Sequence, residues 1–581
     1  MKKSGAKDFK LIIRFWKYLK PHKFLLGIGL LLLPLISLTQ LAQPFLIKAM
    51  IDRVITQKDT SLLLPITLLF IGSLLCQYVF TYLQFITMQV LGQRSLRQLR
   101  QEIFEHIITR SGSFFDSHPV GQLVTRITND VESLSEMFTS GIVSLIGDLV
   151  TLTAILIAMF ILDARLALVA IFLLPILILG TTFFRVRLRR AYEEIRKWVS
   201  QMNIFLSEHL SGIEVIHLFH REPETEKEFS EINRKHYSSH LSSIIYDSSL
   251  YAFVEMLGSI TMGAFIWVAS GNLLQGIITF GVLVAFFELI QKFFTPLRDF
   301  SSKYSIMKTA TVALDKIFHI LDDQSIIPEA KSPYHLPKTP KSIEFDHVIF
   351  GYDPNNPVIK DISFTIEPGE IIAIVGPTGS GKTTIAKLLS RFYEPQKGTI
   401  KISGIDIRDL SLDELRHTVG VVHQDLFLFR DTVGRNIHLG NPDIGEDQTQ
   451  FAAELVHASP FIETLPNKFE EEIVERGRNL SVGQKQLICF ARALAYNPSI
   501  LILDEATGSI DVHHEHLIQR ALKKLLKDRT SIIIAHRLST IRQANRIIVM
   551  HKGEIRETGT HESLLKQHGI YSRLHQLQFQ I

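Results

Sequence analysis

The sequence predicts two domains of different class, an all-α transmembrane domain with six helices and a following α/β domain. Three observations lead to this prediction. The first half of the 581-residue chain contains uncharged stretches of 19 to 34 residues, a proline-rich segment comes after them, and the second half alternates strand and helix patterns. With 46% hydrophobic residues and a formal net charge of +4, the chain is more apolar than most soluble proteins.

The transmembrane domain is predicted to cover residues 1–322. Uncharged runs at 24–47, 60–93 and 166–184 are each long enough to cross ~30 Å of hydrocarbon as a helix. Two weaker stretches, one of them broken by a turn, complete the set. The six predicted helices cover approximately residues 24–49, 61–93, 137–162, 165–186, 248–270 and 276–297.

The flanking charges orient this domain in the membrane. Lysine and arginine cluster before the first span and after the second, fourth and sixth spans, which places the N-terminus and the second domain in the cytoplasm. Helical periodicity continues outward from the membrane to turn-rich tips at 111–123 and 209–222. Buried helices of a soluble enzyme, or a cleaved signal peptide, fit the run lengths and flanking charges less well.

A change in composition marks a linker, predicted at 323–341. Four prolines and little periodicity indicate an exposed segment. The second domain is predicted at 342–581, where short β-rich segments are followed by apolar strands alternating with helices, as in a largely parallel sheet. The two cysteines are Cys76, inside the second predicted span, and Cys489, in the predicted cytoplasmic half, so neither a disulfide framework nor a thiolate metal site is expected.

A phosphate-binding motif lies near the start of the second domain. The segment GPTGSGKTT matches the pattern G-x-x-x-x-G-K-[ST], follows an apolar strand at 371–375 and opens a helix, as such a loop requires. Its backbone N–H groups face phosphate oxygens, its lysine supplies a positive charge, and a hydroxyl ligates Mg²⁺, so ATP and Mg²⁺ are the expected cofactors. The residues predicted to bind ATP here are Gly376, Pro377, Thr378, Gly379, Ser380, Gly381, Lys382, Thr383 and Thr384.

Three further side chains follow apolar strands of the same domain. Asp504 ends the strand in ILILDEA and is predicted to hold Mg²⁺ together with Thr383. Glu505 comes next and is placed to act as the base that activates water. His536 ends another strand, where it is predicted to bond the γ-phosphate. Together with the phosphate loop, these residues predict an ATP hydrolase with the α/β P-loop NTPase fold.

The order and spacing of the phosphate loop, LSVGQ at 480–484, LDEAT at 503–507 and the strand-end histidine resemble the nucleotide-binding domain of an ATP-binding cassette (ABC) protein. With six preceding spans, the whole chain resembles a bacterial exporter-type half-transporter, either multidrug or lipid A flippase-like. The resemblance implies that Tyr352 stacks on adenine and that Gln424 contacts Mg²⁺ or the attacking water. It also implies that the two tips couple the membrane domain to the nucleotide domain.

The start of the helix after Asn479 has free backbone N–H groups and a positive dipole end, which make an anion site. The resemblance implies that its anion is the γ-phosphate of ATP held by a second subunit, with Asp511 also crossing the interface. A second half-transporter is therefore the expected partner, in a homodimer or a heterodimer. The residues predicted to make this contact in trans are Ser481, Val482, Gly483, Gln484 and Asp511.

The family's usual signature is LSGGQ, and Val482 replaces its first glycine. One interpretation is a tolerated variant whose side chain points away from phosphate. The other is a heterodimer in which one ATP site has an altered signature and hydrolyses slowly. An adjacent gene for a half-transporter without a glutamate at the position of Glu505 would favour the second interpretation.

Three acidic residues interrupt the predicted spans, Asp148, Glu255 and Glu288, and all three fall in the inner half of the bilayer. Intramembrane carboxylates usually face a cavity or a partner charge. We therefore expect them to line an inward-facing cavity that favours cationic or amphipathic substrates. The alternative is that they lie at the headgroup level or pair with nearby lysine or arginine.

These observations predict ATP-driven export of amphipathic or hydrophobic molecules, of the multidrug type, by alternating access across the bacterial cytoplasmic membrane. A lipid or lipid A flippase is the main alternative. A peptide exporter is less favoured because no peptidase domain precedes the first span, and an ATP-gated channel or sensor is a further alternative. The expected partners are membrane lipids, a small amphipathic or lipid substrate and a second subunit, and no nucleic acid.

Overall fold

The computed structural model describes residues 2–579 except 173, 276, 331, 338–340, 505–511 and 535–537. The chain forms two compact units. The first comprises Met1–Ile108 and Val120–Asp323, and the second comprises Thr109–Pro119 and Gln324–Ile581. Residues 111–119 of the first predicted tip therefore belong to the same compact unit as the second predicted domain.

The described part of the first unit consists of helices joined by short turns. Three π-helical segments, Met50–Thr56, Arg126–Asp130 and Met137–Ile142, continue neighbouring helices without a turn. Its helices are α1 (Lys2–Leu19), α2 (Lys23–Ala49), α3 (Leu63–Ile108), α5 (Val120–Thr125), α6 (Val131–Glu136), α7 (Val143–Leu162), α8 (Ala164–Phe172), α9 (Leu174–Ser211), α10 (Ile213–Leu218), α11 (Glu222–Leu274) and α12 (Phe280–Leu321).

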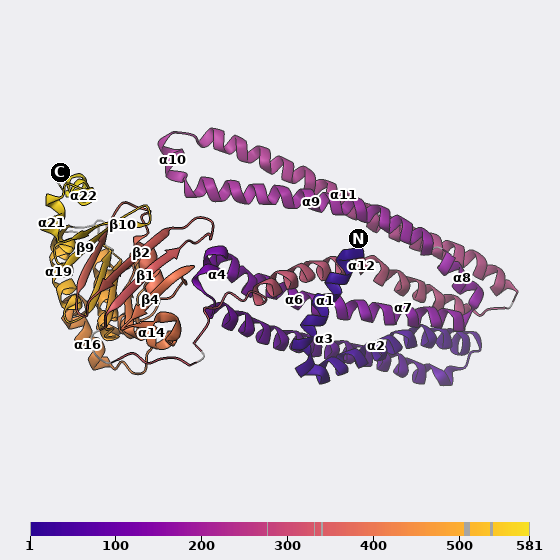
Figure 1. Ribbon diagram of the computed structural model, residues 1–581. Helices are drawn as coiled ribbons and strands as arrows, with labels where there is room; N and C mark the ends of the chain where they lie inside the picture. Colours follow the sequence, from indigo (N-terminus) through magenta and orange to yellow (C-terminus); the bar gives the residue numbers. More distant parts are fainter. Residues whose placement is uncertain are drawn as a thin grey trace. The chain divides into compact units, whose positions relative to one another are not determined.

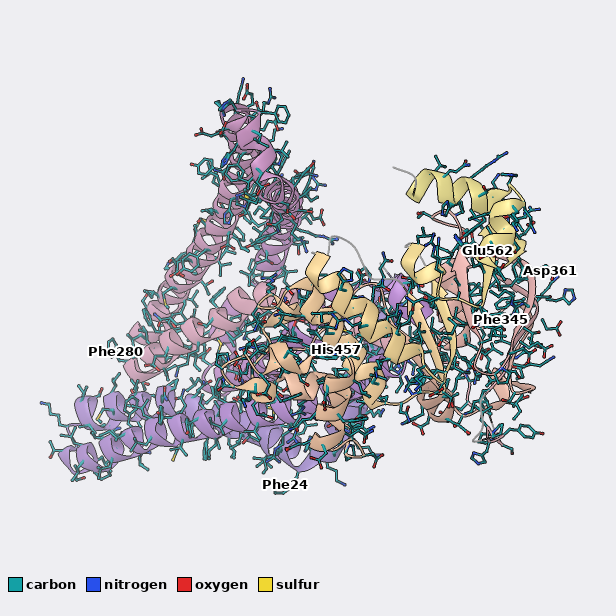
Figure 2. The ribbon with its side chains drawn as sticks, turned by 90° about the vertical axis from the view of Figure 1, so that its left-hand side faces the viewer. Phe24, Phe280, Phe345, Asp361, His457 and Glu562 are labelled. Carbon is teal, nitrogen blue, oxygen red and sulfur yellow. The ribbon has the colours of Figure 1, made fainter. Side chains whose placement is uncertain are left out.

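Four helical stretches among the described residues are long and apolar enough to cross a membrane: Lys10–Thr56, Thr60–Ile108, Val143–Leu162 and Glu222–Leu273. The two other predicted spans coincide with α8 and the start of α9, and with the first half of α12. Large apolar side chains project outward from these helices, for example Phe24, which is 77% exposed (Figure 2). Such a surface is stable in lipid rather than in water.

Helices α9 and α11 form a long hairpin within the first unit. They lie side by side, and α10 joins their far ends (Figure 1). Both helices run well beyond the predicted spans, because charged and polar residues continue their helical pattern for several turns. The second predicted tip, at 209–222, corresponds to α10 and the turns that flank it.

The second unit is built on two sheets. A four-stranded antiparallel sheet has the order β2-β1-β4-β5, and a six-stranded sheet has the order β10-β9-β3-β8-β7-β6, parallel except for β10. The strands are β1 (Ile343–Phe350), β2 (Ile359–Ile366), β3 (Ile371–Val375), β4 (Lys397–Ile402), β5 (Ile405–Asp406), β6 (Val419–Val422), β7 (Ile500–Asp504), β8 (Thr530–Ile534), β9 (Arg546–His551) and β10 (Glu554–Gly559).

The strands of the parallel sheet are almost wholly apolar, because helices cover both of its faces. One face packs on a core that includes α18, and the other packs on a core shared with the antiparallel sheet. The helices of this unit are α4 (Gly112–Ser117), α13 (Lys382–Leu389), α14 (Leu412–Thr418), α15 (Val433–His438), α16 (Glu446–Leu455), α17 (Ser459–Ile462), α18 (Val482–Ala495), α19 (Val512–Leu526), α20 (Leu538–Ile541), α21 (His561–Lys566) and α22 (Ile570–Phe579).

The segment after α12 was expected to be exposed, but the structure holds it against the second unit. Ile327, Leu336 and Lys341 are each less than 10% exposed. The guanidinium of Arg391, itself 2% exposed, donates a hydrogen bond of 2.7 Å to the Pro328 carbonyl. The expectation of an exposed linker is therefore wrong for these positions, and a buried arginine far along the sequence binds the chain at Pro328.

Candidate nucleotide site

The phosphate loop joins β3 to α13 and depends on two glycines for its shape. A Cβ on Gly376 would lie 2.2 Å from the backbone oxygen of Met550, so no larger residue fits there. Gly381 has φ of 100°, in the left-handed region that side chains strain, and it leads directly into α13. The loop therefore packs directly on the Met550 backbone at its start and turns sharply into the N-terminus of α13, where backbone N–H groups are free to bind phosphate.

Two polar side chains of the loop, those of Ser380 and Lys382, are buried. Lys382 is 6% exposed, and its Nζ donates to the carbonyls of Gly376 at 2.8 Å and of Pro377 at 3.0 Å. Burial lowers the pKa of Lys382, and the charge of Asp504 opposes that shift. Ser380 Oγ is buried and has no hydrogen-bond partner among the described residues. An unsatisfied buried hydroxyl beside a lysine fits an anionic ligand.

The sheet order gathers the other predicted side chains at one edge. Strands β3, β8, β7 and β6 are parallel neighbours, so the segments that follow them leave from the same edge of the sheet. Asp504 is the last residue of β7, is 6% exposed and pairs with Ile534 of β8. Gln424 follows β6 and is exposed. Thr383, in the first turn of α13, is also exposed.

Three predicted residues lie outside the described part of the chain: Glu505, Asp511 and His536. The ends of the strands before them are described. Glu505 comes directly after Asp504, and His536 comes two residues after the end of β8. Their predicted roles therefore rest on the sequence.

Tyr352 lies just beyond β1 in a cluster of aromatic rings. It is 46% exposed, and its hydroxyl is 3.4 Å from the Thr384 hydroxyl in α13. Its ring meets Phe350 and Tyr393 edge to face, with centroids 5.2 Å apart in each pair. A half-exposed ring fixed beside the phosphate loop provides a π-face on which a base can stack.

The signature segment begins helix α18 as a capped N-terminus. The Ser481 hydroxyl accepts from the Gln484 backbone N–H at 3.2 Å, and the Gln484 side chain accepts from the Ser481 N–H at 2.9 Å. Ser481 and Val482 are exposed, Gly483 is buried, and the Val482 side chain is 48% exposed. The positive end of this helix therefore faces outward, where a group from another molecule can reach it.

The predicted acids of the membrane domain lie in different surroundings. The Asp148 carboxylate pairs with Lys303 Nζ at 2.5 Å, and the Glu288 carboxylate lies 3.9 Å from Lys292 Nζ. Lys292 also donates to Gln43 Oε1 at 2.9 Å. Glu255 is exposed. Two of the three acids thus have a lysine partner, which is the alternative that the sequence left open.

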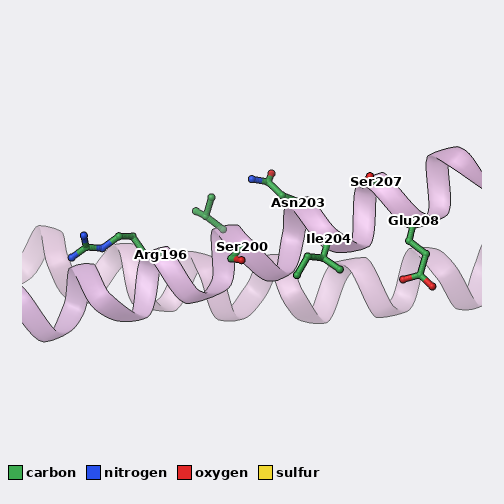
Figure 3. Close-up of a pocket in the computed structure, with 7 residues that line it drawn as sticks. Arg196, Ser200, Asn203, Ile204, Ser207 and Glu208 are labelled. Atoms are coloured by element: carbon green, nitrogen blue, oxygen red, sulfur yellow. The ribbon is translucent and has the colours of Figure 1, made fainter. Parts of the chain in front are cut away.

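A groove of about 780 Å³ lies elsewhere in the first unit, along α9. Figure 3 shows its side chains spaced along that helix. None of the three predicted acids lines it. Its lining residues are Arg196, Val199, Ser200, Asn203, Ile204, Ser207 and Glu208.

Comparisons with known proteins cover nearly the whole chain. A family model described as ABC transporter transmembrane region matches residues 26–297, and one described as ABC transporter matches residues 359–508. The uncharacterized ABC transporter ATP-binding protein YknV of Bacillus subtilis is 38% identical over 97% of this chain and 94% of its own length. The chain belongs to the ABC transporter family.

Other relatives of this ABC transporter carry more specific names. An ATP-dependent lipid A-core flippase of Syntrophus aciditrophicus is 34% identical, over 99% of this chain and 96% of its own length. A probable multidrug resistance ABC transporter, YheH of Bacillus subtilis, is 36% identical over 87% of this chain and 76% of its own.

A solved structure of a bacterial Atm1-family ABC exporter with ATP bound superposes with a TM-score of 0.78 at 28% identity, covering 96% of this chain and 98% of that one. This ABC transporter is therefore a membrane protein with an exporter fold in which the helical domain precedes the ABC ATPase domain. Its family implies nucleotide binding, and the half-transporter fold implies dimerisation.

Sequence reasoning missed two features of this site. Tyr393 and Lys387 join the aromatic cluster around Tyr352, with the Lys387 ammonium 5.1 Å from the Tyr352 ring centroid. Segment 109–119 also packs in this unit. The segment RFYEP that contains Tyr393 gave no signal of its own, since its aromatic partner Tyr352 and its hydrogen-bond partner Asp116 lie far from it in the sequence.

Proposed function

We propose that this chain is one subunit of a dimeric exporter that hydrolyses ATP to move amphipathic or hydrophobic molecules, of the multidrug type, out of the bacterial cytoplasm. The observation that carries the proposal is the orientation of the signature helix. Its capped N-terminus is exposed, and the hydrogen bonds of Ser481 stay within its first turn. A complete ATP site then needs the phosphate loop of one subunit and the signature of another.

The proposed catalytic roles combine the described side chains at the sheet edge with Glu505 and His536, whose roles rest on the sequence. Lys382 and the loop N–H groups hold the β- and γ-phosphates, and Tyr352 stacks on adenine. Thr383, Asp504 and Gln424 would hold Mg²⁺, which would neutralise charge on the phosphates. Glu505 takes a proton from the attacking water, and His536 bonds the γ-phosphate. Ser481 and the Gly483 N–H of the second subunit close the site.

Exposed apolar side chains beyond the predicted spans support the second subunit. In α10 and the residue after it, Leu218 is 76% exposed and Phe219 is 70% exposed. In this part of the chain the expected surroundings are aqueous, so such side chains favour a protein partner. Closure of the two nucleotide domains on ATP then turns the cavity outward, and hydrolysis resets it.

Two of the three acids pair with lysines, which weakens the argument that all three select a cationic substrate. Asp148 with Lys303 and Glu288 with Lys292 are pairs without net charge, so a preference for cations rests chiefly on Glu255. A lipid flippase is the second candidate function. It is favoured by the full-length similarity to a protein named lipid A-core flippase, whereas the multidrug proposal is favoured by the similarity to YheH.

The test is to reconstitute the purified protein in vesicles and compare wild type with Glu505→Gln. We expect the variant to bind ATP normally but to lose at least about 100-fold in ATPase activity, because it lacks the base, and to lose transport with it. Glu562→Gln, an exposed carboxylate in α21, is the matched control and should behave as wild type.

The ligand that stimulates ATPase separates the candidates. Stimulation and uptake of a cationic dye support multidrug export, whereas stimulation and movement of a labelled lipid alone support the flippase. Full ATPase activity in Glu505→Gln, or hydrolysis without movement of any dye or lipid, would contradict export.

A further inference from the structure

Tyr393 connects the proposed adenine platform to segment 109–119. On one side, its ring meets the Tyr352 ring edge to face, with centroids 5.2 Å apart and planes at 89°. On the other side, its hydroxyl donates a hydrogen bond to the Asp116 carboxylate in α4. One side chain therefore touches both the residue proposed to stack on adenine and the tip of the first coupling region.

The fit between Tyr393 and α4 is close at a second point. A Cβ placed on Gly112 would lie 3.1 Å from both Cζ and the hydroxyl oxygen of Tyr393. Glycine at this position lets the helix rest directly on the phenol ring. The contact is therefore both closely packed and hydrogen-bonded at the hydroxyl end of the phenol, so the ring cannot shift without displacing α4.

The rest of α4 is also anchored in this unit. The Ser111 N–H donates to the Ser325 carbonyl at 2.9 Å, and Phe114 is fully buried. Burial and the bond to Asp116 raise the pKa of the Tyr393 phenol, which keeps its hydroxyl protonated as a donor.

Lys387 ties this contact to the phosphate loop. It lies in α13, the helix that begins with Lys382, and its ammonium is 5.1 Å from the Tyr352 centroid and 5.6 Å from the Tyr393 centroid. Cation–π attraction of this kind favours one joint arrangement of the two rings. The aromatic cluster is thus linked to α13 through Lys387 as well as to the proposed adenine site through Tyr352.

We propose that Tyr393 is a positioning residue. When adenine stacks on Tyr352, Tyr393 restrains segment 109–119 through its hydrogen bond to Asp116. The inference deepens the proposed function and rests on it, because stacking of adenine on Tyr352 is part of that proposal. Segment 109–119 is continuous in the chain with α3 before it and α5 after it. Restraint of this segment therefore acts on the ends of two helices of the membrane domain.

The test is hydrogen–deuterium exchange of the full-length protein in lipid nanodiscs, with and without AMP-PNP and Mg²⁺. In wild type, the nucleotide should slow exchange in both 376–384 and 109–119. Tyr393→Phe keeps the ring and removes the hydroxyl, so exchange of 109–119 with nucleotide bound should be about fivefold faster than in wild type, the worth of one such hydrogen bond. Protection of 376–384 should remain.

Two further variants distinguish loss of the Tyr393–Asp116 hydrogen bond from a general loss of structure. Asp116→Ala should match Tyr393→Phe, and the double variant should be no worse than either, because both changes remove the same bond. Tyr334→Phe, a tyrosine that is 62% exposed in the same unit, is the control and should behave as wild type.

Three results would overturn the inference. In the first, nucleotide protects 109–119 equally in wild type and Tyr393→Phe while 376–384 is protected in both. This result overturns the proposed role of Tyr393 but leaves the nucleotide site intact. Additive losses in the double variant also overturn it. Absence of any protection at 376–384 in wild type overturns the nucleotide site and the proposed role of Tyr393 together.

Discussion

Val482 shows how a departure from the family signature is accommodated at the residue scale. It is the first residue of α18, directly after the capping Ser481, and its side chain is 48% exposed. The groups proposed to meet phosphate are the Ser481 hydroxyl and the Gly483 N–H, and neither belongs to Val482. The position of this side chain favours a tolerated variant over an impaired ATP site.

Val482→Gly tests that interpretation. Glycine is less favourable than valine in a helix by only about half a kcal/mol, and the phosphate-facing groups are unchanged, so we expect steady-state ATPase activity to change by less than about threefold. Ser481→Ala removes the proposed contact and should lower activity much more. A large gain of activity in Val482→Gly would instead indicate a slow site, and with it a heterodimer.

The elements of this chain divide into those that sequence predicts and those that it does not. The phosphate loop was predictable because its glycines, lysine and flanking strand all lie within 376–384 and the five residues before them. The apolar spans were predictable because length and composition decide them. Arg391 and Tyr393 were not predictable, since their decisive partners, Pro328 and Asp116, lie 63 and 277 residues away.

Arg391 is one of the residues that attach the proline-rich segment to the nucleotide domain. Besides Pro328, its guanidinium bonds the Ile407 carbonyl at 3.2 Å and the Glu394 carboxylate at 2.8 Å. Prolines alone indicate a stiff and exposed linker, so the sequence pattern gave no sign of this attachment. A linker fixed at this point transmits movement of α12 more directly than a free one.

Arg391→Met retains much of the side-chain volume but removes these bonds. We expect the free energy of unfolding to fall by about 3 kcal/mol, because buried carbonyls and a partly buried carboxylate lose their hydrogen-bond donor. That loss should lower Tm by about 5–10 °C. Proteolysis between 324 and 341 should also become faster. Arg556→Met, which breaks an exposed pair with Glu554, should change neither measurement.

At the scale of the whole molecule, two surfaces that are proposed to contact a second subunit are exposed in a single copy of the chain. The N-terminus of α18 is exposed, and so are Leu218 at the end of α10 and Phe219 after it. Both observations point to a second subunit, and the exporter fold shared with the Atm1-family structure implies the same. The central claim is that each ATP is held by the phosphate loop of one subunit and the signature of the other.

The most direct test of this claim is the ATPase activity of two copies joined by a flexible peptide. One linked dimer carries Lys382→Ala on one copy and Ser481→Arg on the other, and a second linked dimer carries both changes on the same copy. If sites are shared between subunits, the first dimer keeps one intact site and roughly half of the activity, and the second keeps none. The reverse pattern, with activity only when both changes share one copy, would contradict the account.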